Sequence, residues 1–238
     1  MIKIVVLLFI SLFLFGRGYD APDNRSQVKN LLKMIDLDYK VAQLSGCSYT
    51  YDVTSCMDKT MVDTTTCGVK EVNQTIKWIQ VVPDTFFGRN MACMNDAVCT
   101  NVFSKEKFGS PLCCRRVNAK YKMMEADLFN LIPVISEVAK KRDARLFSDV
   151  EKPDFIIGTL KFGDTVMEPI DSRKGDVARV YLYMDARYNL NLTMQQKETF
   201  LRWHTIDEVD AHECAVAKII LKVQGGTNTL VEKGCKKR

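Results

Sequence analysis

The first feature of the hydrophobic pattern is an apolar run at the start of the chain. It spans residues 4–15, follows the basic Lys3, and leads into residues 16–18, which include two glycines. A short apolar run behind a positive charge, with small residues after it, is typical of a secretory signal peptide. A membrane-spanning helix needs about 20 apolar residues, so the run length disfavours the alternative of an uncleaved anchor. We predict a signal peptide over residues 1–18 and one domain over residues 19–238.

Later apolar residues recur at the three-to-four-residue spacing of a helix face. Ser26 suits the N-cap of the first such segment, and Gly225 follows the last one as a helix terminator. Pro133 lies inside the second segment, where its missing N–H and its ring should kink or split a helix. The segments predicted as helices cover residues 28–44, 123–139, 176–188, 193–203 and 208–223.

Shorter apolar runs predict strands. Residues 76–82 form a compact run rich in β-branched side chains, which Pro83 ends. Residues 154–160 and 165–167 have the pattern of a hairpin, with its turn at residues 163–164. Together with the predicted helices, these strands indicate one domain of the α+β class.

Nine cysteines are distributed from residue 47 to residue 235, all within the predicted mature domain. Four of them lie in residues 84–115, which are predicted as an irregular loop stapled by disulfides, whereas the poorly periodic residues 45–75 are predicted as loops and short strands. The chain has only two histidines and no C-x₂-C pair, which disfavours zinc binding. The cysteines therefore favour disulfides in an exported protein, and their odd number leaves at least one thiol free, intermolecular or dispensable.

The charge of the chain is mildly basic. The formal net charge is +5 at pH 7, and the predicted signal peptide holds two basic residues and no acidic one. The mature domain therefore has 32 basic and 29 acidic residues, a net charge of +3. Such an excess permits nucleic-acid binding without indicating it.

Three segments, in order, resemble the bacterial endonuclease I family. They read MEADLFNLIP at residues 124–133, MEP, KGDVAR and YLYM within residues 167–184, and VDAHEC and KVQG within residues 209–225. The resemblance covers about residues 25–235. The family comprises periplasmic or secreted nucleases that cut DNA and RNA without sequence preference. The resemblance implies a largely helical α+β domain, stapled by disulfides, around a ββα-metal (His-Me finger) nuclease core.

The resemblance also places the family's catalytic residues on this chain. A family strand that reads W-E-H-V-V-P carries a Mg²⁺-binding Glu and a general-base His, and an Asn is the second protein ligand. Here residues 77–83 read KWIQVVP, so Ile79 replaces the Glu and Gln80 replaces the His. Asn130 matches the family's Asn, and Asp84 is a candidate substitute ligand.

These two replacements remove the chemistry that the family uses. Isoleucine offers no oxygen to Mg²⁺, and glutamine cannot accept a proton from water near neutral pH. Loss of a general base alone lowers a rate by ~10²–10⁴. We therefore expect catalysis to be impaired, with Mg²⁺ as a cofactor if activity survives and no cofactor otherwise.

The leading hypothesis is binding without efficient catalysis. A monomer, free of the membrane after signal cleavage, would bind DNA or RNA through the backbone, or a protein partner, in the periplasm or outside the cell. One alternative is an active Mg²⁺-dependent endonuclease with a rewired site, and another is a secreted interaction protein with no nucleic-acid role. The basic candidates for phosphate contact, which a solvated basic face would explain equally well, are Lys105, Lys107, Arg115, Arg116, Lys120 and Lys122, with Tyr121 among them.

The resemblance and the positions of the cysteines predict disulfides as well. The expected pairs are Cys214 with Cys235, Cys93 with Cys113 or Cys114, and Cys47 or Cys56 with Cys67, and Cys99 stays unassigned.

Two other sets of polar residues are interpreted as structural. His204 and His212 are expected to be packing or surface residues, and Asp176 and Arg179 to belong to the scaffold.

Overall fold

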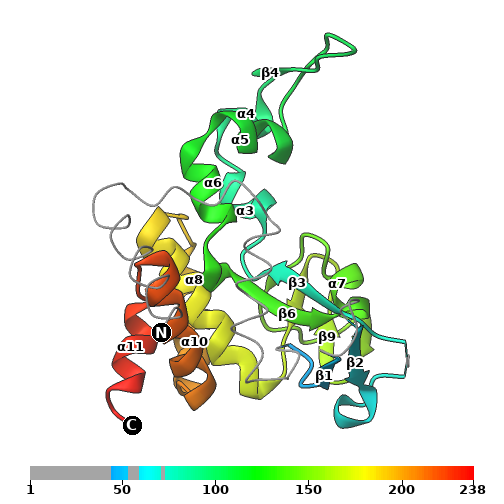
Figure 1. The fold of residues 1–238 in the computed structure, drawn as a ribbon, viewed down its shortest axis with the longest axis vertical. Coiled ribbons are helices and arrows are strands. Elements are labelled where there is room, and N and C mark those ends of the chain that lie inside the picture. Colours follow the sequence, from blue (N-terminus) through cyan, green and yellow to red (C-terminus); the bar gives the residue numbers. More distant parts are fainter. Residues whose placement is uncertain (1–43, 53–58, 71–72) are drawn as a thin grey trace, which may run out of the picture.

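The computed structural model describes residues 44–52, 59–70 and 73–238, and the predicted signal peptide and nearly all of the predicted helix at 28–44 lie outside these residues. The described chain is a mixed α+β fold (Figure 1). Its strands are β1 (Ser48–Asp52), β2 (Lys59–Asp63), β3 (Ile76–Gln80), β4 (Cys99–Thr100), β5 (Lys107–Phe108), β6 (Leu131–Ile135), β7 (Leu146–Phe147), β8 (Phe155–Ile157), β9 (Leu160–Phe162) and β10 (Val166–Glu168). Its helices are α3 (Asp84–Gly88), α4 (Ala92–Asn95), α5 (Pro111–Val117), α6 (Ala119–Glu125), α7 (Ser136–Arg142), α8 (Lys174–Tyr188), α9 (Met194–Ile206), α10 (Ala211–Gln224) and α11 (Thr229–Cys235), with 3₁₀ turns η1 (Thr64–Cys67), η2 (Leu128–Asn130) and η3 (Asp171–Arg173).

The antiparallel pair of β3 and β6 lies between the C-terminal helices and the sheets that contain β1, β2 and β9 (Figure 1). Ile79 faces Ile132 across the pair, and Trp78 faces Pro133. The helix α7 follows β6 directly and contacts both strands. Two strands and a helix thus form one compact unit, and this unit carries the predicted site.

The predicted helix over residues 123–139 is wrong at its centre. The structure has α6, then η2, then the strand β6, and only then α7. Pro133 explains the break, because it cannot donate a helical hydrogen bond and it biases the preceding residue toward extended backbone. The run of residues 131–135 is apolar and partly β-branched, so it suits a strand paired with β3.

The sheet of β7, β10, β9 and β8 packs beside this unit, with β7 parallel to β10 and the other pairs antiparallel. The predicted turn at residues 163–164 is confirmed, because it joins β9 to β10. The predicted strand over residues 154–160 is instead broken at Gly158, which has a φ of +60° and turns β8 back onto β9. A Cβ at this position would lie 2.5 Å from the Cys67 carbonyl oxygen, so the tight turn also requires glycine.

The predicted helices over residues 176–188, 193–203 and 208–223 are confirmed as α8, α9 and α10. Their ends follow local signals: Thr193 and Gln196 form a capping box, and Gly225 ends α10 at a φ of +71°. Among the described residues, no helix is long and apolar enough to cross a membrane.

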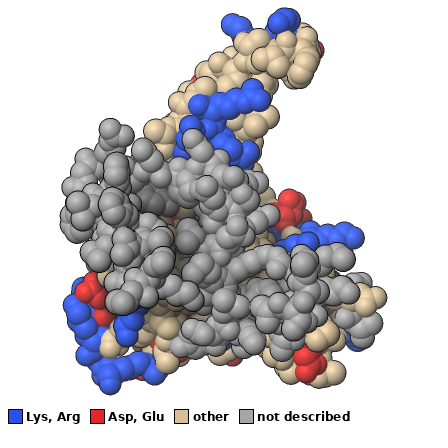
Figure 2. Space-filling model, in the orientation of Figure 1, with Lys and Arg blue, Asp and Glu red and all other residues tan. Residues whose placement is uncertain are grey.

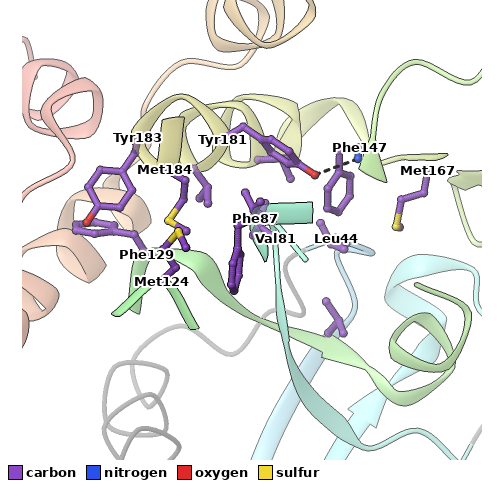
Figure 3. Close-up of a cluster of buried hydrophobic side chains, with 14 of the residues drawn as sticks. Leu44, Val81, Phe87, Met124, Phe129, Phe147, Met167, Tyr181, Tyr183 and Met184 are labelled. Carbon is purple, nitrogen blue, oxygen red and sulfur yellow. Dashed lines mark hydrogen bonds between the residues drawn. The ribbon is translucent and has the colours of Figure 1, made fainter. Parts of the chain in front are cut away.

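The core lies where α8 packs on β3 and η2 (Figure 3). From α8, Tyr183 packs against Phe129, with ring centroids 4.9 Å apart. Tyr181 is fully buried and accepts a hydrogen bond of 3.4 Å from the backbone N–H of Phe147, which burial of so polar a group requires. The core therefore joins the C-terminal helices to the β3–β6 unit.

Residues 91–125, which we call the arm, comprise α4, β4, β5, α5 and α6 and project away from the body (Figure 1). Two disulfides staple the arm, Cys93–Cys114 and Cys99–Cys113. The predicted pair Cys214–Cys235 is confirmed, and of the open alternatives the structure selects Cys114 for Cys93. The fourth disulfide is Cys47–Cys67, and Cys56 lies outside the described residues.

Candidate functional site

The side chain of Gln80 stabilises the turn that follows β3. Its Oε1 accepts a hydrogen bond of 3.1 Å from the backbone N–H of Asp84, the first residue of α3. The N-cap residue Pro83 provides no side-chain acceptor, so Gln80 satisfies one of the N–H groups left open at the helix start. A neutral amide is well suited to this role, and it has no proton-accepting capacity near neutral pH.

The side chain of Asn130 is fully buried and bonded to the backbone of Val82. Its Oδ1 accepts a hydrogen bond of 2.7 Å from the Val82 N–H, and its Nδ2 donates one of 3.0 Å to the Val82 carbonyl. The backbone carbonyl of Asn130 also accepts a bond of 2.9 Å from Val81. Asn130 thus clamps the chain between β3 and α3 to the start of β6.

A surface cavity opens beside the end of β3. Ile79, Gln80, Asp84, Arg142 and Asp143 line it, together with small neighbouring residues of α3 and α7. Asp84 accepts a hydrogen bond of 3.2 Å from the hydroxyl of the buried Tyr121. The cavity is therefore polar on one side and bounded by the apolar Ile79 on the other.

Arg142 is a wall of this cavity that the sequence pattern does not reveal. Only 2% of its surface is exposed, and its Nη2 donates a hydrogen bond of 2.8 Å to the Val81 carbonyl. Its guanidinium lies 4.7 Å from the ring centroid of Phe147, and burial lowers its pKa. In the sequence, Arg142 has the features of a solvated charge at the end of a helix. Its burial against Phe147 depends on tertiary packing, which the sequence pattern does not reveal.

These residues do not fit a Mg²⁺ ion. Ile79 has no ligand atom, and the fully buried Asn130 offers only a neutral Oδ1 that already accepts one hydrogen bond from Val82. Mg²⁺ demands near-octahedral oxygen ligation, usually with carboxylates. Within the described ranges, no three His, Cys, Asp or Glu side chains come together as a metal-binding group. Asp84 and Asp143 are the carboxylates that line the cavity, and two carboxylates do not complete such a ligand set.

Neither histidine lines the cavity beside Gln80, although His212 lines a separate cavity together with Trp78 and Val81. His204 belongs to α9, where its Nδ1 is 3.2 Å from Nη1 of Arg179, and His212 belongs to α10. Burial lowers the pKa of both, for His204 with help from the charge of Arg179. Neither side chain therefore takes the place of the family's general base beside Gln80.

Asp176 and Arg179 lie in a buried ionic cluster that joins α8 to α10. The fully buried Arg179 donates to Glu213 at 2.7 Å through Nε and to Asp176 at 3.0 Å through Nη2. Burial, and then the nearby charge of Asp176, raises the pKa of Glu213 to about 8. The cluster connects helices, which agrees with the interpretation of these residues as scaffold.

The predicted basic residues all lie on the arm, as Figure 2 shows for its blue side chains. Lys105 and Lys107 are exposed at its far end, and Arg116 and Lys120 are exposed nearer the body. Arg115 differs from these, because its Nε donates a hydrogen bond of 2.7 Å to Glu125. Four of the six basic candidates are thus exposed cations, Lys122 is half-buried, and Arg115 is held in an ion pair.

Comparisons with known proteins agree with the sequence motifs. The family model for Endonuclease I matches residues 18–235. An endonuclease-1 of Buchnera aphidicola subsp. Baizongia pistaciae is 28% identical over 225 residues, which covers 90% of this chain and 85% of the relative. A periplasmic deoxyribonuclease of Aeromonas hydrophila is 32% identical over 183 residues, covering 73% of this chain and 72% of the relative. An extracellular deoxyribonuclease of Aeromonas hydrophila is 29% identical, covering 87% of this chain and 88% of the relative.

Proposed function

The chain belongs to the endonuclease I family, and from this premise we propose that it binds nucleic acid while having lost most of the family's hydrolytic activity. It acts in the periplasm or outside the cell, in keeping with its periplasmic and extracellular relatives and its four disulfides. We interpret β3, β6 and α7 as the counterpart of the family's ββα-metal core. The antiparallel pairing of the strands and the position of α7 on them support this interpretation.

The observation that carries the proposal is the bonding of Gln80 and Asn130. Both side chains are committed to backbone groups between β3 and α3, at 3.1 Å for Gln80 and at 2.7 and 3.0 Å for Asn130. An efficient hydrolase of this family needs a proton acceptor beside the scissile phosphate and an ion to stabilise developing charge. Ile79 and Gln80 provide neither, and no histidine lines the cavity beside them.

Nucleic-acid binding is the part of the family's function that the surface of the arm supports. Phosphate contacts need exposed Lys and Arg side chains and no catalytic group. The arm offers such side chains, and it leaves the body through α3, directly after the β3 strand that holds Gln80. A polyanion held along the arm would therefore approach the cavity beside Gln80 and Asp84.

The test is a plasmid-nicking assay on the oxidised mature protein, with Mg²⁺ or with EDTA. The wild-type chain, the double variant Ile79→Glu/Gln80→His and the matched control Ile79→Gln/Gln80→Asn are compared. We expect the wild type and the control to stay within ~10²-fold of the EDTA background, since the base and the ion are both missing. We expect the double variant to nick faster than either.

Binding is measured on the same samples. Fluorescence anisotropy with a labelled oligonucleotide at 50 mM salt should show binding that weakens steeply by 200 mM. Mg²⁺-dependent nicking by the wild type, abolished in Asp84→Ala, would overturn the proposed loss of activity and establish a rewired site. Absence of binding at 50 mM salt would overturn the nucleic-acid role.

A further inference from the structure

The tip of the arm exposes apolar side chains on a rigid turn. Phe103 is 93% exposed and Val102 is 65% exposed, which makes Phe103 the most exposed large apolar side chain among the described residues. The turn is ordered by Asn101, whose Oδ1 accepts hydrogen bonds of 2.9 Å from the N–H of Phe103 and 3.2 Å from that of Ser104. Phe103 is thus presented by a preformed turn, which lowers the entropic cost of using it in binding.

Two disulfides hold this turn in place relative to the body. Cys99–Cys113 closes the base of the β4–β5 hairpin, and Cys93–Cys114 ties α4 to α5 beside it. At Gly109 the backbone approaches so closely that a Cβ would lie 2.4 Å from the carbonyl oxygen of Asp96. These constraints fix the position of the tip relative to the rest of the arm. The exposed ring of Phe103 is therefore held at a defined place.

The charge of the arm indicates the kind of partner. The arm carries six Lys and Arg residues against three Asp and Glu residues, an excess of three positive charges. This equals the whole +3 excess of the predicted mature domain, so the remainder of that domain is balanced. The exposed Lys105 and Lys107 follow Phe103 closely in the sequence, and further Lys and Arg side chains lie along the arm (Figure 2). A polyanion with apolar faces complements this surface.

We propose that Phe103 stacks on an unpaired base of a single-stranded nucleic acid whose phosphates contact Lys105 and Lys107. This rests on the proposed nucleic-acid binding and assigns a contact within it. Base–aromatic stacking beside a basic track is the general way in which single strands are held without sequence preference. A lipid surface is the less suitable partner, because the tip offers only two neighbouring apolar side chains and the cations extend well beyond it.

The experiment measures binding of a fluorescein-labelled dT20 strand and of a duplex of equal length, at salt concentrations from 50 to 200 mM. Phe103→Ala should weaken dT20 binding by about fivefold to 100-fold, the usual effect of losing one stacked base. The slope of log affinity against log salt should stay unchanged, because no charge is removed. Lys105→Ala/Lys107→Ala should instead lower that slope by about 1.4.

Two further variants keep the test decisive. Met194→Ala removes another exposed apolar side chain, 73% exposed on α9 and outside the arm, and should leave binding unchanged. Phe103→Trp should retain affinity, and dT20 should quench its fluorescence through stacking.

Each result distinguishes the stacking contact from the underlying function. Binding of dT20 that Phe103→Ala leaves intact, with no quenching of Phe103→Trp, would overturn the stacking contact and leave the proposed function standing. No binding of dT20 or duplex by the wild type would overturn both. A blue shift of Phe103→Trp with vesicles of phosphatidylcholine and phosphatidylglycerol, without quenching by dT20, would assign the tip to a membrane and overturn the contact.

Discussion

Replacing Asn130 by alanine should destabilise the protein strongly. The substitution removes both side-chain hydrogen bonds to Val82, of 2.7 and 3.0 Å, in a place where both residues are fully buried. The N–H and the carbonyl of Val82 then have no side-chain partner, and each unsatisfied buried group costs about 1–3 kcal/mol. We expect the free energy of unfolding to fall by about 2–4 kcal/mol, within the range of large single-residue effects.

The measurement is urea unfolding of the oxidised protein, followed by circular dichroism. With a slope of about 2.5 kcal/mol per molar urea, the midpoint should fall by about 1–1.5 M. Asn95→Ala is the control, because Asn95 is exposed and donates one hydrogen bond of 2.6 Å to the Arg89 carbonyl. Its loss should cost less than about 1 kcal/mol.

Urea unfolding with and without Mg²⁺ also tests whether Asn130 is a metal ligand. A ligand that binds only the folded state stabilises it by mass action, so a bound Mg²⁺ would raise the urea midpoint. We expect no shift of the wild-type midpoint with millimolar Mg²⁺. The reasoning would be refuted if Asn130→Ala cost no more than Asn95→Ala while Mg²⁺ stabilised the wild type alone.

Three more predictions concern the scaffold around the site. The pKa of Glu213 is raised from 4.5 to about 8 in the folded state, so its contribution to stability is complete below about pH 4.5 and is lost as the pH rises through about 8. The urea midpoint of the wild type should therefore fall between pH 6.5 and 8.5, and that of Glu213→Gln should stay nearly constant. The double variant Cys99→Ser/Cys113→Ser opens a disulfide with a sequence separation of 14, and its free energy of unfolding in urea should fall by about 3 kcal/mol. Trypsin should cleave the tip of the arm faster, and unchanged cleavage would show that Cys93–Cys114 alone keeps the arm ordered. Gln80→Ala removes the acceptor at the start of α3 and should cost about 1 kcal/mol in the same assay, and no loss would mean that water replaces the amide.

The sequence predicts the long helices well because their signals are local. The helices α8, α9 and α10 combine apolar spacing with caps, and these caps act within a few residues of the helix ends. The strand β6 was the clear failure, since its apolar run satisfies a helix as well as a strand until it pairs with β3. The two partners are more than 50 residues apart, and nothing in the run itself records that pairing.

The strand that carries the motif residues was predictable from the sequence, and the bonding of these residues was not. The motif at residues 77–83 places Ile79 and Gln80 on β3, as the structure has them. The clamp from Asn130 to Val82 joins residues 48 positions apart, and the contact of Arg142 with Phe147 depends on how α7 packs. Such contacts arise from tertiary structure, so a sequence motif can name a candidate ligand without showing that its atoms are already engaged.

The bonding of Gln80 offers a physical reason why the fold accommodates glutamine at the position where the proposed function places the loss of a catalytic side chain. The turn after β3 has to redirect the chain into α3, and Pro83 leaves the helix start without a capping side chain. Gln80 accepts the Asp84 N–H there, and Asn130 fixes Val82 on the other side of the same turn. Gln80 therefore supplies a hydrogen bond to the turn that leads into α3, and the arm begins after this helix. In the proposed function, nucleic-acid binding by the arm depends on the structure of this turn and does not depend on phosphodiester hydrolysis.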